Sequence, residues 1–156
     1  MPADNSIDLD YTISTDKQRL DLALVHRYLS QSSYWAQGRP REVVAKSIES
    51  SLCFGAYTSD GRQVGFARVV TDRATIAWLC DVFVLEEHRG RGLGKRLVEA
   101  VVSHPDLRHL RRILLATSDA HGLYRGYGGF APLSHPERWM EKLAPADEGT
   151  SDGPPE

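Results

Sequence analysis

The chain has 156 residues, of which 41% are hydrophobic and 26% charged, and its formal net charge is −2 at pH 7. This length and balance predict one soluble globular domain with a core of its own. They disfavour proteins that bind nucleic acids or anionic membranes through a basic surface, because a slightly acidic chain is not drawn to either. The sequence holds no apolar run of the ~18 residues that a membrane span needs, and its start lacks a signal-peptide pattern, so we expect a cytoplasmic protein.

The first part of the chain predicts one strand followed by two helices. Tyr11–Ser14 has the pattern of a short strand, and Thr15-Asp16 offers an N-cap for a helix whose apolar residues recur at helical spacing. Residues 30–40 are rich in Ser, Gln, Gly and Pro and predict a loop. Pro40 favours the start of a second helix that runs to about Ser50.

A meander of three strands is predicted next. Residues 53–58 and 63–71 flank Ser59-Asp60-Gly61-Arg62, which is a hairpin turn signal, and a third strand covers about 75–85. The two cysteines, Cys53 and Cys80, fall in these apolar segments without the spacing of metal ligands. We therefore expect buried free thiols in a reducing compartment and no metal site.

The last part of the chain predicts helices alternating with short strands. A helix begins near Leu93 and ends before Pro105, a buried strand covers 112–116, and a short helix covers 119–127. Residues 130–133 and 139–143 favour a last pair of strands. Three parts are expected along the chain: a flexible lead over residues 1–8, one domain over 9–143 and a disordered tail over 144–156.

The segment from Cys80 to Val98 is the most informative, because an apolar strand there leads through a glycine-rich loop into a helix. The first N–H groups of a helix have no internal partners and lie at the positive end of its dipole. Glycines at 90, 92 and 94 remove side chains that would hold a ligand away from those donors. The loop is thus a predicted site for a phosphorylated ligand, the alternative being a plain helix-capping turn.

The spacing of this loop excludes two common phosphate motifs. A Walker loop needs Gly-Lys-Ser/Thr, whereas Gly94-Lys95 is followed by Arg96, and the glycines do not fit the dinucleotide fingerprint. The pattern that fits is Arg-x-x-Gly-x-Gly over 89–94. This loop resembles the acyl-CoA loop of the Gcn5-related N-acetyltransferase (GNAT) superfamily. Residues 120–130, with Leu-Tyr followed by Gly-Phe, are similar to a second segment of that family.

The resemblance implies an α/β (α+β) fold in a single domain, with a mixed, mostly antiparallel central sheet flanked by helices. It also implies acetyl-CoA as co-substrate. In the family the loop amides hold the coenzyme diphosphate and a strand edge pairs with the pantetheine, which here gives the set Val82, Phe83, Val84, Arg89, Gly90, Arg91, Gly92, Leu93, Gly94 and Lys95. The cations among them also fit solvated surface side chains.

The resemblance further implies Tyr124 as the general acid that protonates the departing thiolate, since a phenol with a pKa of ~10 stays protonated at neutral pH. Asp81, inside an otherwise apolar strand, is the candidate base, and a structural acid paired with a backbone group or an arginine is the alternative. His121 is a second candidate base, with the alternative of a surface residue at a helix start.

The acceptor is expected to meet side chains of the first loop and of the facing strands. These are Tyr34, Trp35, Arg39, Arg68 and Trp78, whose aromatic rings could cage an amine. The same residues equally fit the core and lid of a small α/β domain, and Arg68 could instead pair with Asp72 or Asp81.

The predicted function is direct transfer of an acetyl group from acetyl-CoA to a small amine or amino-acid-like acceptor. One alternative is a CoA-binding regulatory or interaction module without catalysis. Another is nucleic-acid binding through the basic runs at 88–91 and 108–112, which the acidic overall charge opposes. Partners are therefore expected to be a small molecule and, by resemblance to relatives that pair, a second copy of the chain, with no nucleic acid and no membrane.

Overall fold

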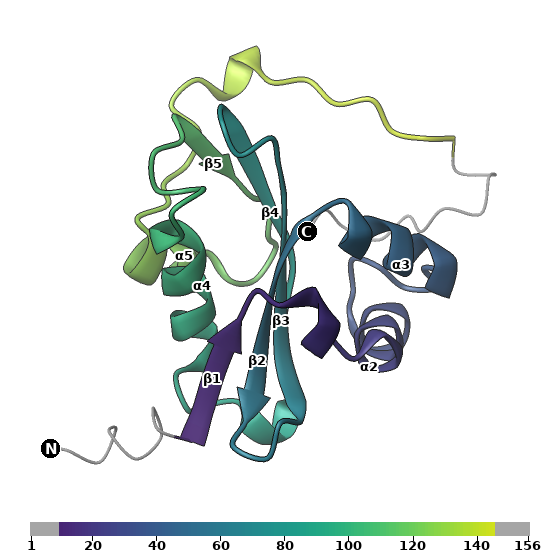
Figure 1. Ribbon diagram of the computed structural model, residues 1–156. Helices are drawn as coiled ribbons and strands as arrows, with labels where there is room; N and C mark the ends of the chain where they lie inside the picture. The colour runs from purple at the N-terminus through teal and green to yellow at the C-terminus, as the bar shows by residue number, and fades with distance from the viewer. Residues whose placement is uncertain (1–9, 146–156) are drawn as a thin grey trace, which may run out of the picture.

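The computed structural model describes residues 10–145, in which a five-stranded sheet separates two pairs of helices (Figure 1). The strands follow the order β1-β2-β3-β4-β5, with the first four antiparallel in succession and β5 parallel to β4. They are β1 (Tyr11–Ser14), β2 (Leu52–Thr58), β3 (Gln63–Thr71), β4 (Ile76–Val84) and β5 (Arg112–Leu114). The predicted mixed, mostly antiparallel sheet in a single α/β domain is confirmed.

Helices cover both faces of the sheet. In Figure 1 α2 and α3 lie on one side of it, and α4 and α5 lie on the other. The helices are α2 (Leu22–Arg27, continued by a π-helical turn over Tyr28–Ser32), α3 (Arg41–Glu49), α4 (Leu93–Ser103) and α5 (His121–Gly128). Short 3₁₀ turns cover Lys17–Arg19, Glu86–His88 and Pro136–Arg138. None of the helices in residues 10–145 is long and apolar enough to cross a bilayer.

The core consists of two apolar clusters, one on each face of the sheet. The helix α4 buries Leu93, Leu97, Val98 and Val101 against one face, as its apolar periodicity predicts. On the other face Val25, Leu29 and Val44 pack with sheet residues that include Phe66 and Phe83. Both cysteines are buried free thiols, as expected.

The sequence predicted the start of the first helix too early. Asp16 caps the 3₁₀ turn at Lys17–Arg19, with its carboxylate accepting from the Gln18 N–H at 3.0 Å. A second Asx cap follows, in which Asp21 accepts from the Leu24 N–H at 3.0 Å, and α2 begins only there. Two capping acids five residues apart divide the segment, because each sets extended backbone at its own position.

The predicted last pair of strands, 130–133 and 139–143, is wrong. The chain there forms one 3₁₀ turn at Pro136–Arg138 and no strand within the described residues. Pro132, inside the first of these segments, carries no N–H group for a strand ladder, and Pro136 begins the turn between the two segments. The predicted lead over residues 1–8, and the tail from residue 146 onward, lie outside the described residues.

Two irregularities of β4 shape the middle of the sheet. Parallel pairing with β5 covers only Ile76, Ala77 and Trp78, so the same edge of β4 has no paired strand from Leu79 onward within residues 10–145. The antiparallel register with β3 also shifts, because two residues of β4, Asp81 and Val82, stand opposite one residue of β3. The sheet therefore opens between β4 and β5 next to a β-bulge.

The bulge changes which residues of β4 face each side. Ala77 and Leu79 pack in the cluster under α4, and beyond the bulge Val82 and Val84 pack there instead. Asp81 takes a left-handed backbone with φ of 55°, which is costly for a residue other than glycine. Simple strand alternation therefore does not hold across this position.

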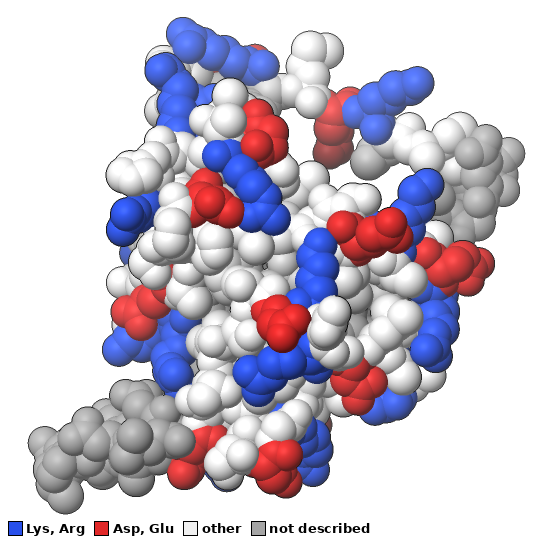
Figure 2. Space-filling view, viewed as in Figure 1, with Lys and Arg blue, Asp and Glu red and all other residues white. Residues whose placement is uncertain are grey.

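Charged side chains are mixed on the surface. On the face that Figure 2 shows, Lys and Arg side chains are interspersed with Asp and Glu. This distribution agrees with the nearly neutral net charge of −2.

Candidate active site

The glycine-rich loop connects the end of β4 to α4 with two left-handed turns. Gly90 and Gly92 have φ values of 78° and 80°, which glycine adopts without the steric cost that a side chain brings. A Cβ atom added at either position would have no heavy atom within 4 Å. The space above both glycines is therefore open to a ligand.

The start of α4 supplies backbone donors at this open space. The first helical hydrogen bond runs from the Arg96 N–H to the Gly92 carbonyl at 3.0 Å, and Gly92 as N-cap provides no side-chain acceptor. The N–H groups of Leu93, Gly94 and Lys95 precede that bond, so they lack intrahelical acceptors. Together with the helix dipole they form a cradle that suits a phosphate or diphosphate.

Two of the three basic residues of the loop make hydrogen bonds to other parts of the fold. Arg89 donates from Nε to the Val84 carbonyl at 2.9 Å and from Nη2 to the Tyr28 hydroxyl at 2.8 Å. Arg91 donates to the Tyr11 hydroxyl at 2.9 Å. Lys95 is exposed, with its ammonium 5.1 Å from the centre of the Tyr127 ring. Arg89 thus fixes the loop against β4, while all three cations remain exposed.

The edge of β4 beside the opening holds Val82, Phe83 and Val84. Val82 and Val84 are half-buried and Phe83 is buried, stacked on Tyr28 with ring centres 4.0 Å apart. The Val84 carbonyl is already an acceptor for Arg89, whereas no strand of the described chain pairs with this edge. An extended ligand can therefore add to the sheet here as an extra strand would.

Tyr124 lies in the middle of α5 and is only 8% exposed. Its ring packs edge-on against Phe130, with centres 5.8 Å apart. The helix α5 continues to Gly128, and Gly129 closes it with a φ of 72°. A Cβ at Gly128 would lie 2.7 Å from the Phe130 ring, so the close packing of α5 requires glycine there.

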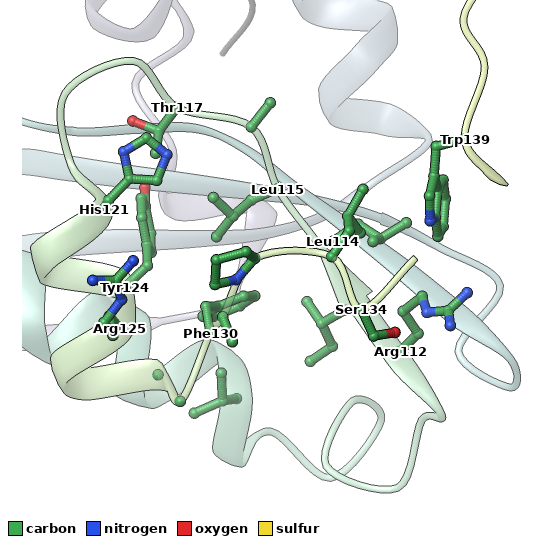
Figure 3. A pocket seen from close by; sticks show the side chains of 18 of the residues that line it. Arg112, Leu114, Leu115, Thr117, His121, Tyr124, Arg125, Phe130, Ser134 and Trp139 are labelled. Carbon is green, nitrogen blue, oxygen red and sulfur yellow. The ribbon is translucent and has the colours of Figure 1, made fainter. Parts of the chain in front are cut away.

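Tyr124 borders two cavities. The smaller, of about 60 Å³, lies at the opening between β4 and β5, and Tyr34, Trp35, Asp81, Val82 and Thr117 are among its other lining residues. The larger, of about 770 Å³, lies along β5, α5 and the chain that follows α5. Figure 3 shows Thr117, His121 and Tyr124 together at one end of the larger cavity, with Arg112 and Trp139 at the other. Tyr124 thus lies where the two spaces meet.

Asp81 is 2% exposed and its carboxylate accepts three hydrogen bonds. Trp35 Nε1 donates to Oδ1 at 2.9 Å, while Arg39 Nη1 and Arg68 Nε donate to Oδ2 at 2.9 and 2.8 Å. Arg68 also donates to the Ser51 hydroxyl at 3.1 Å. This arrangement favours the structural role that the sequence left open for Asp81, since both oxygens are held by cationic or indole donors.

The predicted acceptor residues do not all reach the opening. Tyr34 and Trp35 line the smaller cavity, with their rings perpendicular and 5.0 Å apart between centres. Arg68 is held by Asp81, and Trp78, 39% exposed, lies on the paired part of β4 opposite Leu114; neither is among the residues that line either cavity. The loop over residues 33–39 therefore forms the wall nearest to the bulge.

The sequence did not predict the second wall of the opening, which the segment between β5 and α5 forms. The Ser118 N–H donates to the Tyr34 hydroxyl at 3.0 Å, which ties the first loop to the segment between β5 and α5. Thr117 and Asp119 from that segment line the smaller cavity with Tyr34. The only sequence signal was an acid just before a short helix, which is also typical of an ordinary helix start.

Comparison with known proteins gives the family. Residues 22–129 match the model of the acetyltransferase (GNAT) family. A protein of Gibberella zeae that is named as an acetyltransferase is 32% identical over 137 residues, which cover 74% of this chain and 76% of that protein. Both the loop and the Tyr124 segment lie inside the matched range, except for Phe130.

Solved structures share the architecture. A crystal structure of a GNAT-family protein from Xanthomonas campestris is 54% identical, covers 90% of this chain and 97% of its own, and superposes with a TM-score of 0.84. An acetyltransferase from Clostridium acetobutylicum, solved with acetyl-CoA, is 14% identical over 86% of this chain and 95% of its own, with a TM-score of 0.62, and shares the fold. By family match, sequence identity and fold, the chain belongs to the GNAT family of acetyltransferases.

Proposed function

We propose that this acetyltransferase moves an acetyl group from acetyl-CoA to the amino group of a small amine or amino-acid-like acceptor. The observation that carries the proposal is the open cradle at the start of α4, which adjoins a strand edge without a paired strand in residues 10–145. A coenzyme with a diphosphate and an amide-bearing arm matches these two features together. GNAT enzymes use acetyl-CoA, and one structural neighbour was solved with it.

Bound acetyl-CoA would supply a thioester carbonyl at the opening between β4 and β5. The acceptor nitrogen forms a bond to the carbonyl carbon, and the carbon–sulfur bond breaks with its electron pair on sulfur. The bonded nitrogen loses one N–H proton to solvent, while Tyr124 gives its phenolic proton to the sulfur and is then reprotonated from solvent. A backbone N–H at the bulge of β4 would stabilise the negative charge that develops on the carbonyl oxygen.

Two measurements test coenzyme binding. Acetyl-CoA should raise the melting temperature of the wild type, and Gly92→Val should abolish that rise by placing a side chain in the cradle. The control is Lys142→Val, which changes an exposed residue outside the loop and should leave the rise intact. No rise in the wild type would refute the site.

Kinetics test the role of Tyr124. Release of free thiol from acetyl-CoA with a panel of amines should fall by about 10²-fold or more in Tyr124→Phe. Tyr127→Phe, on the same helix but exposed, should retain activity. Coenzyme binding without turnover on any amine would instead favour a non-catalytic CoA-binding module.

We also propose that the chain forms a homodimer through the segment that follows α5. This segment, which runs outward in yellow in Figure 1, exposes Met140 by 96% and Leu143 by 76%, and Leu133 and Trp139 by more than a third. Apolar side chains in one exposed segment are typical of an interface. Light scattering should give a dimer mass for the wild type and a monomer mass for a Met140→Glu/Leu143→Glu variant, while Lys142→Glu should stay dimeric; a monomeric wild type contradicts the proposal.

A further inference from the structure

The small cavity between β4 and β5 has two carboxylates in its lining, Asp81 and Asp119. They come from opposite walls, because Asp81 belongs to the bulge of β4 and Asp119 to the segment between β5 and α5. Tyr124 borders the same cavity. The cavity therefore has a carboxylate from each of two different elements in the same lining as Tyr124.

The two carboxylates differ in their capacity to accept hydrogen bonds from a ligand. Asp81 is buried, with both oxygens engaged by Trp35, Arg39 and Arg68. Asp119 is exposed, and its Oδ1 accepts from the Thr117 hydroxyl at a long 3.3 Å. A carboxylate with a long bond to a neutral donor can accept strong hydrogen bonds from an ammonium group, whereas one held by two guanidinium groups has little capacity left.

Backbone bonds hold Asp119 in place. The Thr117 hydroxyl accepts from the Ala120 N–H at 3.2 Å and from the Asp119 N–H at 3.4 Å. The Ser118 N–H is bonded to the Tyr34 hydroxyl at 3.0 Å. The segment is thus tied both to α5, which carries Tyr124, and to the loop that forms the facing wall.

We propose that Asp119 is a catalytic residue that binds the ammonium form of the acceptor and takes up the proton that the amine must lose before it attacks. The inference rests on the proposed transfer to an amine. An alkylammonium has a pKa of about 10, so nearly all of the acceptor arrives protonated at neutral pH. Its N–H proton passes to the Asp119 carboxylate and on to solvent, which the exposure of Asp119 permits. The freed electron pair then forms the bond to the carbonyl carbon.

The test compares two acceptors of nearly the same shape, one protonated and one neutral at pH 7, and measures each variant against the wild type on the same acceptor. For the best alkylamine substrate R–CH₂–NH₂ found in the screen, the matched probe is the alkoxyamine R–O–NH₂, which has nearly the same shape and is neutral at pH 7. Asp119→Asn keeps the size of the side chain and removes its charge. Glu99→Gln, an exposed residue on α4, makes the same change of charge away from the cavity.

We expect Asp119→Asn to lower kcat/KM for the alkylamine by about 10²-fold and for the alkoxyamine by no more than about threefold, with an unchanged thermal shift by acetyl-CoA. Glu99→Gln should leave both values as in the wild type. Equal losses on both acceptors, or no loss on either, would overturn the role of Asp119 while leaving the proposed transferase intact. A wild type that binds acetyl-CoA and turns over neither acceptor would refute the proposed function itself, and the inference with it.

Discussion

Trp35 donates its indole N–H to the carboxylate of Asp81 over 2.9 Å, which joins two residues 46 positions apart in the chain. The bond connects the loop between α2 and α3 to the bulge of β4 at its left-handed residue. Arg39 adds a second bond from the same loop to the same carboxylate. Asp81 therefore acts as the anchor of one wall of the opening between β4 and β5.

Removing the charge of Asp81 should destabilise the protein strongly. Asp81→Asn keeps the shape and tolerates the left-handed backbone, but it leaves the half-buried Arg39 and Arg68 without their carboxylate. We expect a loss of about 3 kcal/mol in the free energy of unfolding, measured by urea denaturation.

The matched control is Asp106→Asn, which removes a partner of Arg73 in an ion pair where the two side chains are 43% and 47% exposed. That change should cost less than about 1 kcal/mol, because exposed pairs contribute little. Similar losses for the two variants would contradict the anchoring role of Asp81.

A methyl group at Gly55 should also destabilise the fold. Its Cβ would clash with the hydroxyl oxygen of Tyr57, whose side chain is fully buried. We expect Gly55→Ala to cost about 2 kcal/mol in thermal or urea unfolding. Gly126→Ala, on the exposed face of α5 with no atom within 4 Å, should instead gain about 0.5–1 kcal/mol; a neutral Gly55→Ala would show that β2 can shift.

The hydroxyl of Tyr57 should be dispensable. It is buried and finds no hydrogen-bond partner within residues 10–145, and burial raises the pKa of Tyr57 above its ordinary value. Tyr57→Phe keeps the ring, over which the Arg19 guanidinium lies at 4.1 Å, so stability should be unchanged or higher by about 1 kcal/mol. Tyr11→Phe loses bonds to His88 and Arg91 and should be less stable than the wild type. A loss in Tyr57→Phe as large as in Tyr11→Phe would disprove the prediction.

Stability should fall at alkaline pH because of Cys53. Burial raises the pKa of the Cys53 thiol from 9.0 to about 11. Below pH 9 the thiol is protonated in both the folded and the unfolded chain, so its contribution to the free energy of unfolding is complete. It is lost as the pH rises from about 9 to about 11, because the unfolded chain gives up its proton first; two pKa units correspond to at most about 3 kcal/mol. The free energy of unfolding can be measured by urea denaturation between about pH 7 and about pH 10.5. Cys53→Ala should make its decrease with pH less steep, and an unchanged slope would assign the decrease to other groups.

Local sequence signals predicted the backbone of the glycine-rich loop and the helix that follows it. Gly90 and Gly92 take the left-handed conformations that glycine favours, and the apolar periodicity of α4 reproduces its buried face. These features depend on residues within a few positions of one another. The family resemblance added a mixed, mostly antiparallel sheet flanked by helices, which the structure confirms.

The walls of the opening could not be predicted, because they depend on distant residues. Whether Asp81 is a base or an anchor depends on a bulge against β3 and on donors from Trp35, Arg39 and Arg68. Strand alternation alone places its side chain by a rule that the bulge breaks. Asp119 gives only the signal of a helix start until the fold brings it to the cavity that Tyr124 borders.

Hydrogen bonds hold the loop that carries Tyr34 and Trp35 to Ser118 on one side and to Asp81 on the other. Hydrogen bonds within the chain therefore set the width of the opening between this loop, β4 and the segment before α5. If the proposed amine acceptors enter here, we expect selectivity by size, and replacing either aromatic side chain should change which amines are accepted more than it changes the rate of transfer.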